Sequence, residues 1–316
     1  MAQRSVTVQN FFEDNAETLD LRLVAGRKGL KKVIKEPTVN RPGLALAGHT
    51  KYFAFRRVQV FGNAESSYLK TVTLAERAKR YQALFNKFQI PCIVFCRNQR
   101  PDRELLKAVE ERNIPVFRSS LISMKFINLA TLALEVLFAP RGSEMGSMVD
   151  IHGIGVLVRG DSGIGKSECI LSLIERGYSL IADDITKVVL LDNREVIGSS
   201  PELTRSFMEV RGIGIVNVAA LFGARSIRQS KRLDLVVTLK HWKEVEDVDR
   251  LGMDEEFIKI LGVDVPHVIL PVRPGRDLGR LIEVAALQTK LKRTGYNPAE
   301  DLNAQLTAKM KANSNL

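Results

Sequence analysis

Residues 160–167 read Gly160-Asp161-Ser162-Gly163-Ile164-Gly165-Lys166-Ser167 and complete the G-x-x-x-x-G-K-[ST] pattern of a phosphate-binding loop. In such a loop, backbone N–H groups point inward, and the positive end of the following helix adds to the attraction for anions. Lys166 is expected to reach the outer phosphates, and the Ser167 hydroxyl is expected to coordinate Mg²⁺. A glycine-rich turn that binds nothing can also match this pattern, so the flanking sequence has to decide.

The flanking sequence has the arrangement that a phosphate-binding loop requires. Residues 154–158 form a short apolar run typical of a buried strand. After the loop, Ile170, Leu173 and Ile174 recur at helical spacing, and Gly177 is a plausible helix stop. Strand, glycine loop and helix therefore follow one another, which predicts a protein that binds a phosphate chain.

Composition narrows the class of partner. The chain has 316 residues, enough for two domains, and its 47 Lys and Arg against 36 Asp and Glu give a formal net charge of +11. This excess favours an anionic partner, which could be a nucleotide, inorganic phosphate, nucleic acid or an acidic protein surface. The early basic residues are not interleaved with aromatics, so nucleic-acid binding is permitted but not indicated.

Nothing in the sequence indicates a membrane or a disulfide framework. The first residues lack a hydrophobic signal region, and no uncharged apolar run approaches membrane-spanning length. Three cysteines, Cys92, Cys96 and Cys169, make an odd number without paired metal spacing. We expect them to be reduced core residues of a cytoplasmic protein.

The first half of the chain alternates strands and helices. Strands are expected near Val58–Phe61 and over residues 90–95 and 114–117, with helices over 68–87 and 103–111. This order predicts an α/β domain with a mainly parallel sheet, and the absence of a catalytic constellation favours a docking or assembly role. A helix over 127–138 places the boundary near residue 130, giving domains 1–130 and 131–316.

Two adjacent carboxylates end a short apolar run in the second half. Asp183 and Asp184 follow Leu180-Ile181-Ala182, and ligands of open α/β sheets gather at the carboxyl ends of strands. Because adjacent strand residues point to opposite faces, one of the two should face the nucleotide. That carboxylate could hold Mg²⁺ or accept the proton of an attacking hydroxyl. The alternative is a solvated acidic strand end.

Residues 188–198 suggest a hairpin, and a glycine-containing apolar run follows it. Gly212 and Gly214 in this run imply close approach of the backbone to another group. Glu209 and Arg211 suit Mg²⁺ and phosphate oxygens respectively, although spacing alone favours a surface ion pair on a strand. The complete run is Met208, Glu209, Val210, Arg211, Gly212, Ile213, Gly214, Ile215, Val216 and Asn217.

Two further stretches contain arginines that could bind phosphate. Arg250, in Asp-Arg-Leu-Gly, proves nothing alone, because a lone arginine is usually a solvated charge. A rigid loop ends another strand and carries two guanidinium groups that could grip phosphate or cap the final helix, which starts near Asp277. The loop comprises Pro271, Val272, Arg273, Pro274, Gly275 and Arg276.

Together these stretches resemble the HPr kinase/phosphorylase family, bacterial enzymes that phosphorylate a serine of the phosphocarrier protein HPr. The resemblance covers nearly the whole chain, and its motifs occur in the family's order. They are residues 160–168, 181–184, 208–218, 249–252 and 271–276 in the second half, and Arg41-Pro42-Gly43-Leu44 with Gly48, residues 57–69 and residues 90–92 in the first half.

The resemblance implies a role for each site residue. Lys166 would neutralise the β- and γ-phosphates of ATP, with pyrophosphate as an alternative donor, and Ser167 with Glu209 would hold Mg²⁺. Asp184 corresponds to the catalytic aspartate, which takes the serine proton in the forward reaction and returns it in the reverse one, with Asp183 assisting. Arg250 would stabilise charge on the phosphoryl group in transit.

The resemblance also implies a second reaction, the removal of phosphate from the carrier, together with the fold and the assembly. Residues 271–276 look like the loop used chiefly for dephosphorylation, in which inorganic phosphate attacks phosphoserine and releases pyrophosphate. The implied fold is a smaller α/β domain followed by a P-loop kinase domain with phosphoenolpyruvate-carboxykinase-like features, assembled as a hexamer. The implied setting is carbon catabolite regulation through the phosphotransferase system.

One position departs from the family. Its pattern upstream of the loop begins His-Gly, where this chain has Met145-Gly146. Methionine cannot exchange protons, and His152 is expected to pack in the core or on the surface instead of replacing the lost group. The main hypothesis is a serine kinase of HPr that also catalyses phosphorolysis. Alternatives are a one-way kinase, a non-catalytic nucleotide or phosphate sensor, and, more weakly, a small-molecule kinase or carboxykinase-type enzyme.

Overall fold

The computed structural model describes residues 6–245 and 255–313, and the chain divides into two compact units. The first unit ends at Ala139 and the second begins at Pro140. This division lies beyond the sequence-based boundary near residue 130, which falls inside helix α6 (Ser123–Phe138). The whole of α6 belongs to the first unit because its buried face, with Phe126 and Leu134, packs in that unit's core.

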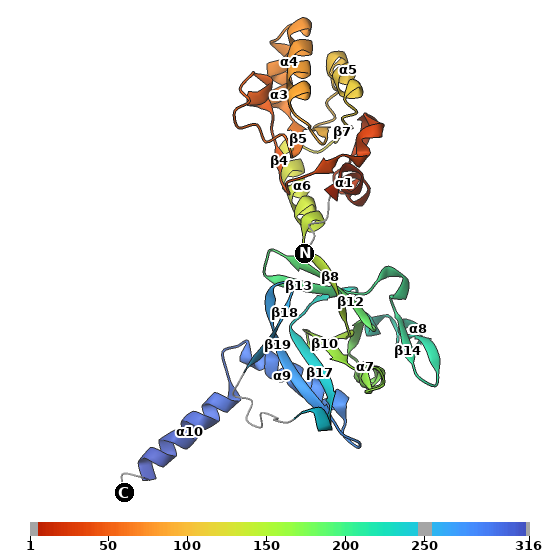
Figure 1. Ribbon diagram of the computed structural model, residues 1–316, viewed down its shortest axis with the longest axis vertical. Helices are drawn as coiled ribbons and strands as arrows, with labels where there is room; N and C mark the ends of the chain where they lie inside the picture. Colours follow the sequence, from red (N-terminus) through yellow and green to blue (C-terminus); the bar gives the residue numbers. More distant parts are fainter. Residues whose placement is uncertain (1–5, 246–254, 314–316) are drawn as a thin grey trace. The chain divides into compact units, whose positions relative to one another are not determined.

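The first unit contains a five-stranded sheet in the order β2-β7-β6-β5-β4 (Figure 1). Strands β4 to β7 run parallel and β2 runs antiparallel to β7, as expected from the alternation of strands and helices. A short antiparallel pair, β1 with β3, lies outside this sheet. The strands are β1 (Val6–Thr7), β2 (Arg22–Ala25), β3 (Val33–Ile34), β4 (Val39–Asn40), β5 (Val58–Phe61), β6 (Ile93–Phe95) and β7 (Val116–Arg118).

Helices cover both faces of this sheet. One core contains residues of α1 and α6, and the other contains residues of α2 to α5. The single helix expected over 68–87 is wrong: two helices occupy this region, because the Thr73 hydroxyl accepts a hydrogen bond from the Glu76 N–H (3.3 Å) and starts a new helix. The helices are α1 (Val8–Asn15), η1 (Arg27–Lys31), α2 (Gly43–Leu46), α3 (Asn63–Lys70), α4 (Leu74–Lys87), α5 (Arg103–Glu111) and α6.

The second unit contains a six-stranded sheet, a four-stranded sheet and a two-stranded ribbon (Figure 1). The six-stranded sheet has the order β11-β9-β10-β17-β19-β18, with β10, β17 and β19 parallel. The four-stranded sheet, β16-β13-β12-β8, is antiparallel throughout. The strands are β8 (Arg141–Met145), β9 (Ser147–Ile151), β10 (Ile154–Gly160), β11 (Ser179–Ala182), β12 (Ile185–Leu191), β13 (Glu195–Ser199), β14 (Phe207–Val210), β15 (Gly214–Asn217), β16 (Ser230–Arg232), β17 (Leu235–His241), β18 (Glu256–Ile260) and β19 (Val263–Val272).

These elements form layers around the six-stranded sheet. On one face, Val156 and Val158 of β10 share a core with α7 and α9. On the other face, Leu157 of the same strand shares a core with Val188 of the four-stranded sheet. The helical elements are α7 (Lys166–Glu175), η2 (Glu202–Thr204), α8 (Val218–Phe222), η3 (Ala224–Ser226), η4 (Trp242–Glu244), α9 (Leu278–Lys292) and α10 (Pro298–Asn313).

Two local predictions are confirmed. The hairpin expected over 188–198 is the β12–β13 pair, turned by Asp192 and Asn193 with φ of 50° and 53°. The cysteines are free and buried at all three positions. Burial raises the pKa of Cys96 and of Cys169 to about 11, so both thiols stay protonated at neutral pH.

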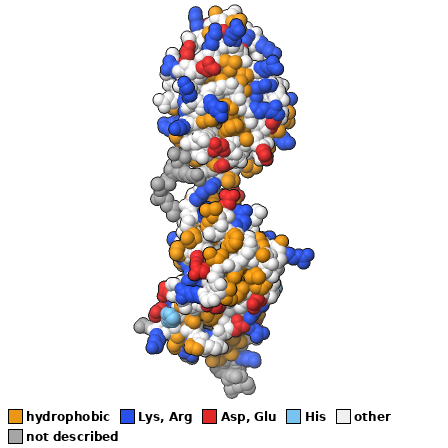
Figure 2. Space-filling model, turned by 90° about the vertical axis from the view of Figure 1, so that its right-hand side faces the viewer, with side chains coloured by type: hydrophobic (Ala, Val, Ile, Leu, Met, Phe, Trp, Pro, Cys, Tyr) orange, Lys and Arg blue, Asp and Glu red, His pale blue; other side chains and the backbone are white. Residues whose placement is uncertain are grey.

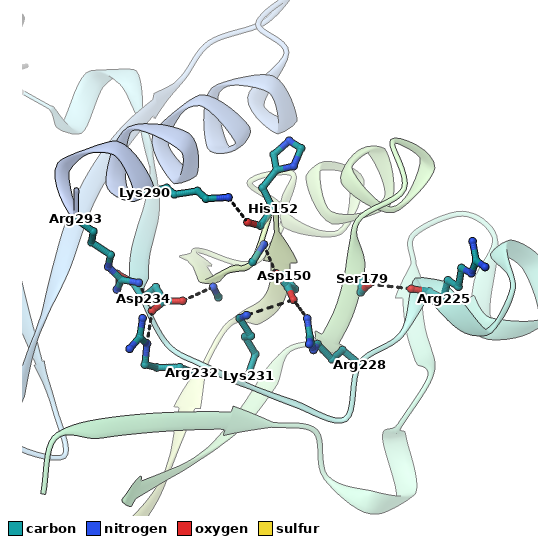
Figure 3. Close-up of polar contacts among 12 residues, drawn as sticks. Asp150, His152, Ser179, Arg225, Arg228, Lys231, Arg232, Asp234, Lys290 and Arg293 are labelled. Carbon is teal, nitrogen blue, oxygen red and sulfur yellow. Dashed lines mark hydrogen bonds and ion pairs between the residues drawn. The ribbon is translucent and has the colours of Figure 1, made fainter. Parts of the chain in front are cut away.

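Buried charges stabilise the end of the six-stranded sheet at which the parallel strands β10 and β17 begin (Figure 3). The Asp234 carboxylate is 1% exposed and accepts hydrogen bonds from the Gly155 N–H (2.7 Å) and from Arg232 Nε (2.7 Å), with Arg293 at 2.6 Å. Asp150, also buried, pairs with Arg228. These contacts fix the start of β10, and the phosphate-binding loop follows its other end.

The surface of the first unit carries scattered basic side chains. Figure 2 shows Lys and Arg distributed over the visible face of this unit, between apolar and uncharged side chains. Across the described ranges, no helix is both long enough and apolar enough to span a membrane.

Candidate active site

The phosphate-binding loop links the end of β10 to the start of α7, as predicted. Gly160 ends β10 with φ of 153°, and a Cβ there would lie 2.8 Å from the Leu239 carbonyl oxygen. Gly165 is the N-cap residue of α7 with φ of 101°, in the left-handed region that favours glycine. Ile164, only 4% exposed, anchors the loop in the core shared by β10 and α7.

Lys166 lies over its own loop. Its Nζ donates hydrogen bonds to the carbonyl oxygens of Gly160 (2.8 Å) and Asp161 (2.9 Å). The ammonium group is therefore held at the mouth of the loop, where phosphate oxygens would attract it more strongly than neutral carbonyls do. Ser167, the second residue of α7, is half-buried beside it.

A cavity of about 360 Å³ opens at this loop. Its walls come from the loop and the start of α7, from the turn between β11 and β12, and from the β14 ribbon. The lining residues are Ser162, Gly163, Gly165, Lys166, Ser167, Glu168, Asp184, Glu209 and Arg211. Four residues predicted for phosphoryl transfer, Lys166, Ser167, Asp184 and Glu209, thus share one space although they come from distant parts of the sequence.

Asp184 reaches this cavity from a strained turn. The Ile185 N–H donates to the Asp183 carbonyl oxygen (2.6 Å), and the residue between them, Asp184, has φ of 55°. This is a γ-turn with a positive central φ, the rarer and more strained of the two γ-turn types. Two hydrogen bonds hold it: the Gly146 N–H donates to the Asp184 carbonyl oxygen (2.7 Å), and the Asp184 N–H donates to Ser147 Oγ (3.2 Å).

Asp183 does not line the cavity and instead joins two elements. Its Oδ1 accepts a hydrogen bond from Ser147 Oγ (2.8 Å), and its Oδ2 accepts one from the Glu209 N–H (3.1 Å). Burial raises the pKa of Asp183, although these two hydrogen bonds act in the opposite direction. One aspartate thus faces the cavity and the other points elsewhere, as predicted, but the cause is the turn and not the alternation of a strand.

The β14–β15 ribbon carries the signature residues 208–217. Met208 and Val210 are buried in the core beside α7, so Glu209 between them faces the opposite side and lines the cavity. Arg211 also lines the cavity, and its NH2 donates to Ser162 Oγ (2.7 Å). The alternative of a surface ion pair between Glu209 and Arg211 is therefore wrong.

The two ribbon glycines have a different role from the one expected. A Cβ added to Gly212 or Gly214 would meet no protein atom within 4 Å, so no other described part of the chain approaches the backbone closely here, and an approach to a bound group stays a prediction. Their φ values are 84° and 104°, which non-glycine residues rarely adopt. These glycines allow the ribbon to turn between β14 and β15.

The loop of residues 271–276 does not line the cavity. The Arg273 guanidinium lies 2.9 Å from the centroid of the Trp242 ring. Asp277 is the cap of α9, because its Oδ1 accepts from the Arg280 N–H (2.9 Å). The suggestion that the loop itself caps this helix is therefore wrong. Arg250 lies outside the described residues.

Met145 and His152 lie at opposite ends of β9. Met145 is 73% exposed at the end of β8, paired in register with Ile185, the residue that follows Asp184. His152 is exposed in the turn between β9 and β10, where its Nε2 lies 2.7 Å from the Tyr178 hydroxyl. His152 therefore does not replace a histidine at position 145, as expected.

The oxygen atoms around the cavity suit a magnesium ion. The Ser167 hydroxyl and the carboxylates of Glu209 and Asp184 are hard oxygen donors, which Mg²⁺ prefers. Among the described residues, no group of three or more His, Cys, Asp or Glu side chains could hold a metal ion on its own. This donor set fits an ion that completes its coordination with phosphate oxygens and water.

Sequence reasoning missed Ser147. This residue is fully buried at the start of β9 and bonds to both aspartates of the β11–β12 turn. A single serine in an apolar strand gives no signal of such a role, because its partners lie far away in the sequence.

Comparisons with known proteins match both units of the chain to domains of the same kind of enzyme. A family model for the HPr Serine kinase N terminus matches residues 6–134, and one for the HPr Serine kinase C-terminal domain matches residues 137–306. An HPr kinase/phosphorylase from Listeria monocytogenes serotype 4a is 42% identical over 313 residues, 99% of this chain and 99% of that protein. Another from Bacillus cereus is 40% identical over 294 residues, 93% and 95% of the two chains.

Among solved structures, that of the Hpr(Ser) kinase/phosphatase from Coxiella burnetii is 32% identical to the region it matches. It covers 51% of this chain and 98% of its own, with a TM-score of 0.47. The two family models together span most of the sequence, and the relatives cover nearly all of it. The chain therefore belongs to the HPr kinase/phosphorylase family.

Proposed function

We propose that this chain is a bifunctional enzyme that phosphorylates a serine of an HPr-type phosphocarrier protein and also removes that phosphate by phosphorolysis. The observation that carries this proposal is the shared cavity, in which Lys166, Ser167, Asp184 and Glu209 come together. Family membership supports the same substrate, because the relatives in Listeria monocytogenes and Bacillus cereus are HPr kinase/phosphorylases.

In the forward direction, each cavity residue has a distinct task. Asp184 accepts the proton of the substrate serine while the serine oxygen bonds to the γ-phosphorus and the bond from that phosphorus to the β-phosphate oxygen breaks. Lys166 and the loop N–H groups neutralise the outer phosphates. Ser167 and Glu209 would hold Mg²⁺, which when bound draws negative charge from the phosphate oxygens.

In the reverse direction, an oxygen of inorganic phosphate attacks the phosphorus of phosphoserine. The serine oxygen leaves, takes back a proton from Asp184, and pyrophosphate is the other product. We assign the loop of residues 271–276 chiefly to this reaction, and Arg250 to stabilising the phosphoryl group in transit. Pyrophosphate is accordingly a possible donor beside ATP.

The remaining family properties belong to the same proposal. We expect the second unit to have a P-loop kinase fold like that of phosphoenolpyruvate carboxykinase, and the first unit to serve docking or assembly in a homohexamer. We also expect a cytoplasmic enzyme that regulates carbohydrate use through the phosphotransferase system, with no nucleic acid or membrane as partner.

Met145 supports a second candidate function, a kinase that works in one direction only or a sensor that binds nucleotide without transfer. Methionine at position 145 cannot donate or accept a proton, and it lies beside the turn that carries Asp184. The loss of one proton-transfer group would weaken the reverse reaction before it weakened ATP binding.

A direct test compares wild-type protein with Asp184→Asn. Radiolabelled ATP, Mg²⁺ and an HPr-type carrier measure the forward reaction, and phosphoserine-carrier with inorganic phosphate measures the reverse. Asparagine keeps the shape of the side chain and tolerates a positive φ, so the turn should fold normally. Asp192→Asn is a matched control, because Asp192 also has a positive φ (50°) but lies in the β12–β13 turn.

The expected result is a loss of about 10²- to 10⁴-fold in both directions for Asp184→Asn, the usual contribution of a general base, with ATP affinity unchanged. The control should keep wild-type rates. Forward transfer without reversal in the wild-type protein would assign it to the one-way kinases. ATP binding without any transfer would overturn the enzyme proposal in favour of a sensor.

A further inference from the structure

Ser147 is a buried polar residue next to the cavity but not part of it. It is the first residue of β9, and its exposed fraction is 0%. Neither ATP nor a protein substrate can therefore touch its hydroxyl. Any effect of this residue on the reaction must act through its neighbours.

The Ser147 hydroxyl makes two hydrogen bonds that join both aspartates. It donates to Asp183 Oδ1 (2.8 Å) and accepts from the Asp184 N–H (3.2 Å). The second oxygen of Asp183 accepts from the Glu209 N–H (3.1 Å). A continuous chain of hydrogen bonds thus runs from the backbone of Asp184 through Ser147 and Asp183 to the backbone of Glu209.

We propose that Ser147 is a positioning residue that sets the distance between the Asp184 carboxylate and the Glu209 carboxylate, with Asp183 as the connecting group. The inference rests on the proposed function, because it concerns the general base and a magnesium ligand of that site. It also assigns Asp183 a task different from assisting in proton transfer: Asp183 holds the β14 ribbon against the β11–β12 turn.

Removing the hydroxyl should alter position more than folding. In Ser147→Ala, the Asp184 N–H loses its acceptor and Asp183 loses a donor. The turn nevertheless keeps the hydrogen bond from the Gly146 N–H to the Asp184 carbonyl oxygen (2.7 Å). The phosphate-binding loop belongs to other elements, β10 and α7, so ATP binding should remain.

The kinetic consequence follows from the need for close alignment. A displacement of about 1 Å in a reacting group can cost about 10²-fold in rate. We therefore expect Ser147→Ala to lower kcat for phosphoryl transfer by about 10- to 100-fold while KM for ATP changes by less than about threefold.

The experiment compares four variants in the full-length protein: Ser147→Ala, Asp183→Asn, the double variant and Ser226→Ala. Ser226 is a matched control, because its side chain is also buried and hydrogen-bonded, to the carbonyl oxygens of Val218 and Gly223, away from the turn. Steady-state kinetics give kcat and KM, calorimetry gives the ATP dissociation constant, and thermal denaturation tests folding.

If Ser147 acts through Asp183, the double variant should be no slower than the slower single variant, since both break the same chain of hydrogen bonds. Ser226→Ala should keep its kcat. The inference is wrong if Ser147→Ala retains more than a third of the wild-type kcat, if its loss lies in KM or ATP affinity, or if the two single losses multiply. If Ser147→Ala fails to fold, Asp183→Asn alone decides by the same kcat and KM criteria. A wild-type protein that binds ATP but transfers no phosphate would overturn the proposed function and this inference together.

Discussion

The buried carboxylate of Asp234 provides a quantitative test of what stabilises the second unit. Asp234→Ala removes the acceptor for the Gly155 N–H and the partner of Arg232 and Arg293 (Figure 3). Breaking a buried ion pair costs roughly 3–5 kcal/mol. Because the side chains of Arg232 and Arg293 are 47% and 36% exposed, both can regain water, and the cost should lie at the lower end.

We therefore expect a loss of about 3 kcal/mol, of which roughly 1–3 kcal/mol comes from the Gly155 N–H left buried without an acceptor. For a unit of this size, such a loss lowers Tm by roughly 6–12 °C. The matched control is Asp264→Ala, because the Asp264 side chain is 57% exposed and pairs with Lys259 at the surface. An exposed pair contributes about 0–1 kcal/mol.

Urea denaturation followed by tryptophan fluorescence measures this difference. The chain has one tryptophan, Trp242, and it lies in the second unit, so its emission reports the unfolding of that unit. Asp234→Asn provides an intermediate, since it keeps an acceptor oxygen but not the charge. Equal free energies of unfolding for the Asp234 and Asp264 alanine variants would refute the reasoning.

Three further predictions concern the departure from the family, the pH dependence and the 271–276 loop. Met145→His should raise the rate of phosphate-driven pyrophosphate release, because a ring that can exchange protons then stands beside the turn that carries Asp184; coupled pyrophosphate detection measures this rate against wild type. Burial lowers the pKa of His267 and outweighs the opposing effect of Glu256, whose carboxylate is 3.6 Å away. The pKa of His267 is lower in the folded protein than in the unfolded chain, so the neutral ring stabilises the fold above about pH 6.5, and this contribution is lost as the pH falls through the folded-state pKa. We therefore expect His267→Gln to show a smaller decrease of Tm between about pH 7 and 5 than the wild-type protein. Trp242→Ala removes the ring that Arg273 stacks on and should slow phosphorolysis about three- to tenfold, whereas Trp242→Phe should retain most of the rate, as measured with phosphoserine-carrier.

Features set by local chemistry could be read from the sequence. The strand, loop and helix around residues 160–167 were predictable because glycine is needed where φ is positive and the apolar spacing changes from strand to helix at the loop. The hairpin at Asp192 and Asn193 was predictable for a related reason, since Asp and Asn tolerate the positive φ that both central residues of its turn adopt. In each case the signal and the structure lie within the same few residues.

Features set by tertiary contacts could not be read in this way. The glycines of the β14–β15 ribbon suggested close packing, but only the structure shows open space around them and a turn that needs their φ. Ser147 gave no signal because its partners, Asp183 and Asp184, come from another strand connection. The sequence likewise could not assign α6 to the first unit, because that assignment depends on which core the apolar face of the helix packs in.

The geometry of Asp184 favours an enzyme over a sensor. A positive φ at a non-glycine residue in a strained turn costs about 1–3 kcal/mol and persists only where the surroundings enforce it. At Asp192 the conformation has a local cause: Asp192 and Asn193 are the central residues of the turn between β12 and β13, which the hydrogen bond from the Arg194 N–H to the Leu191 carbonyl oxygen (3.0 Å) closes. Asp184 lies in no such hairpin turn. There it is enforced from outside the turn, by Gly146 and Ser147, and its result is that a carboxylate enters the same cavity as Lys166 and Glu209. Binding a phosphate chain requires only the loop and the helix N-terminus, so a sensor would gain nothing from this strain, whereas a kinase needs its base held where the substrate hydroxyl arrives.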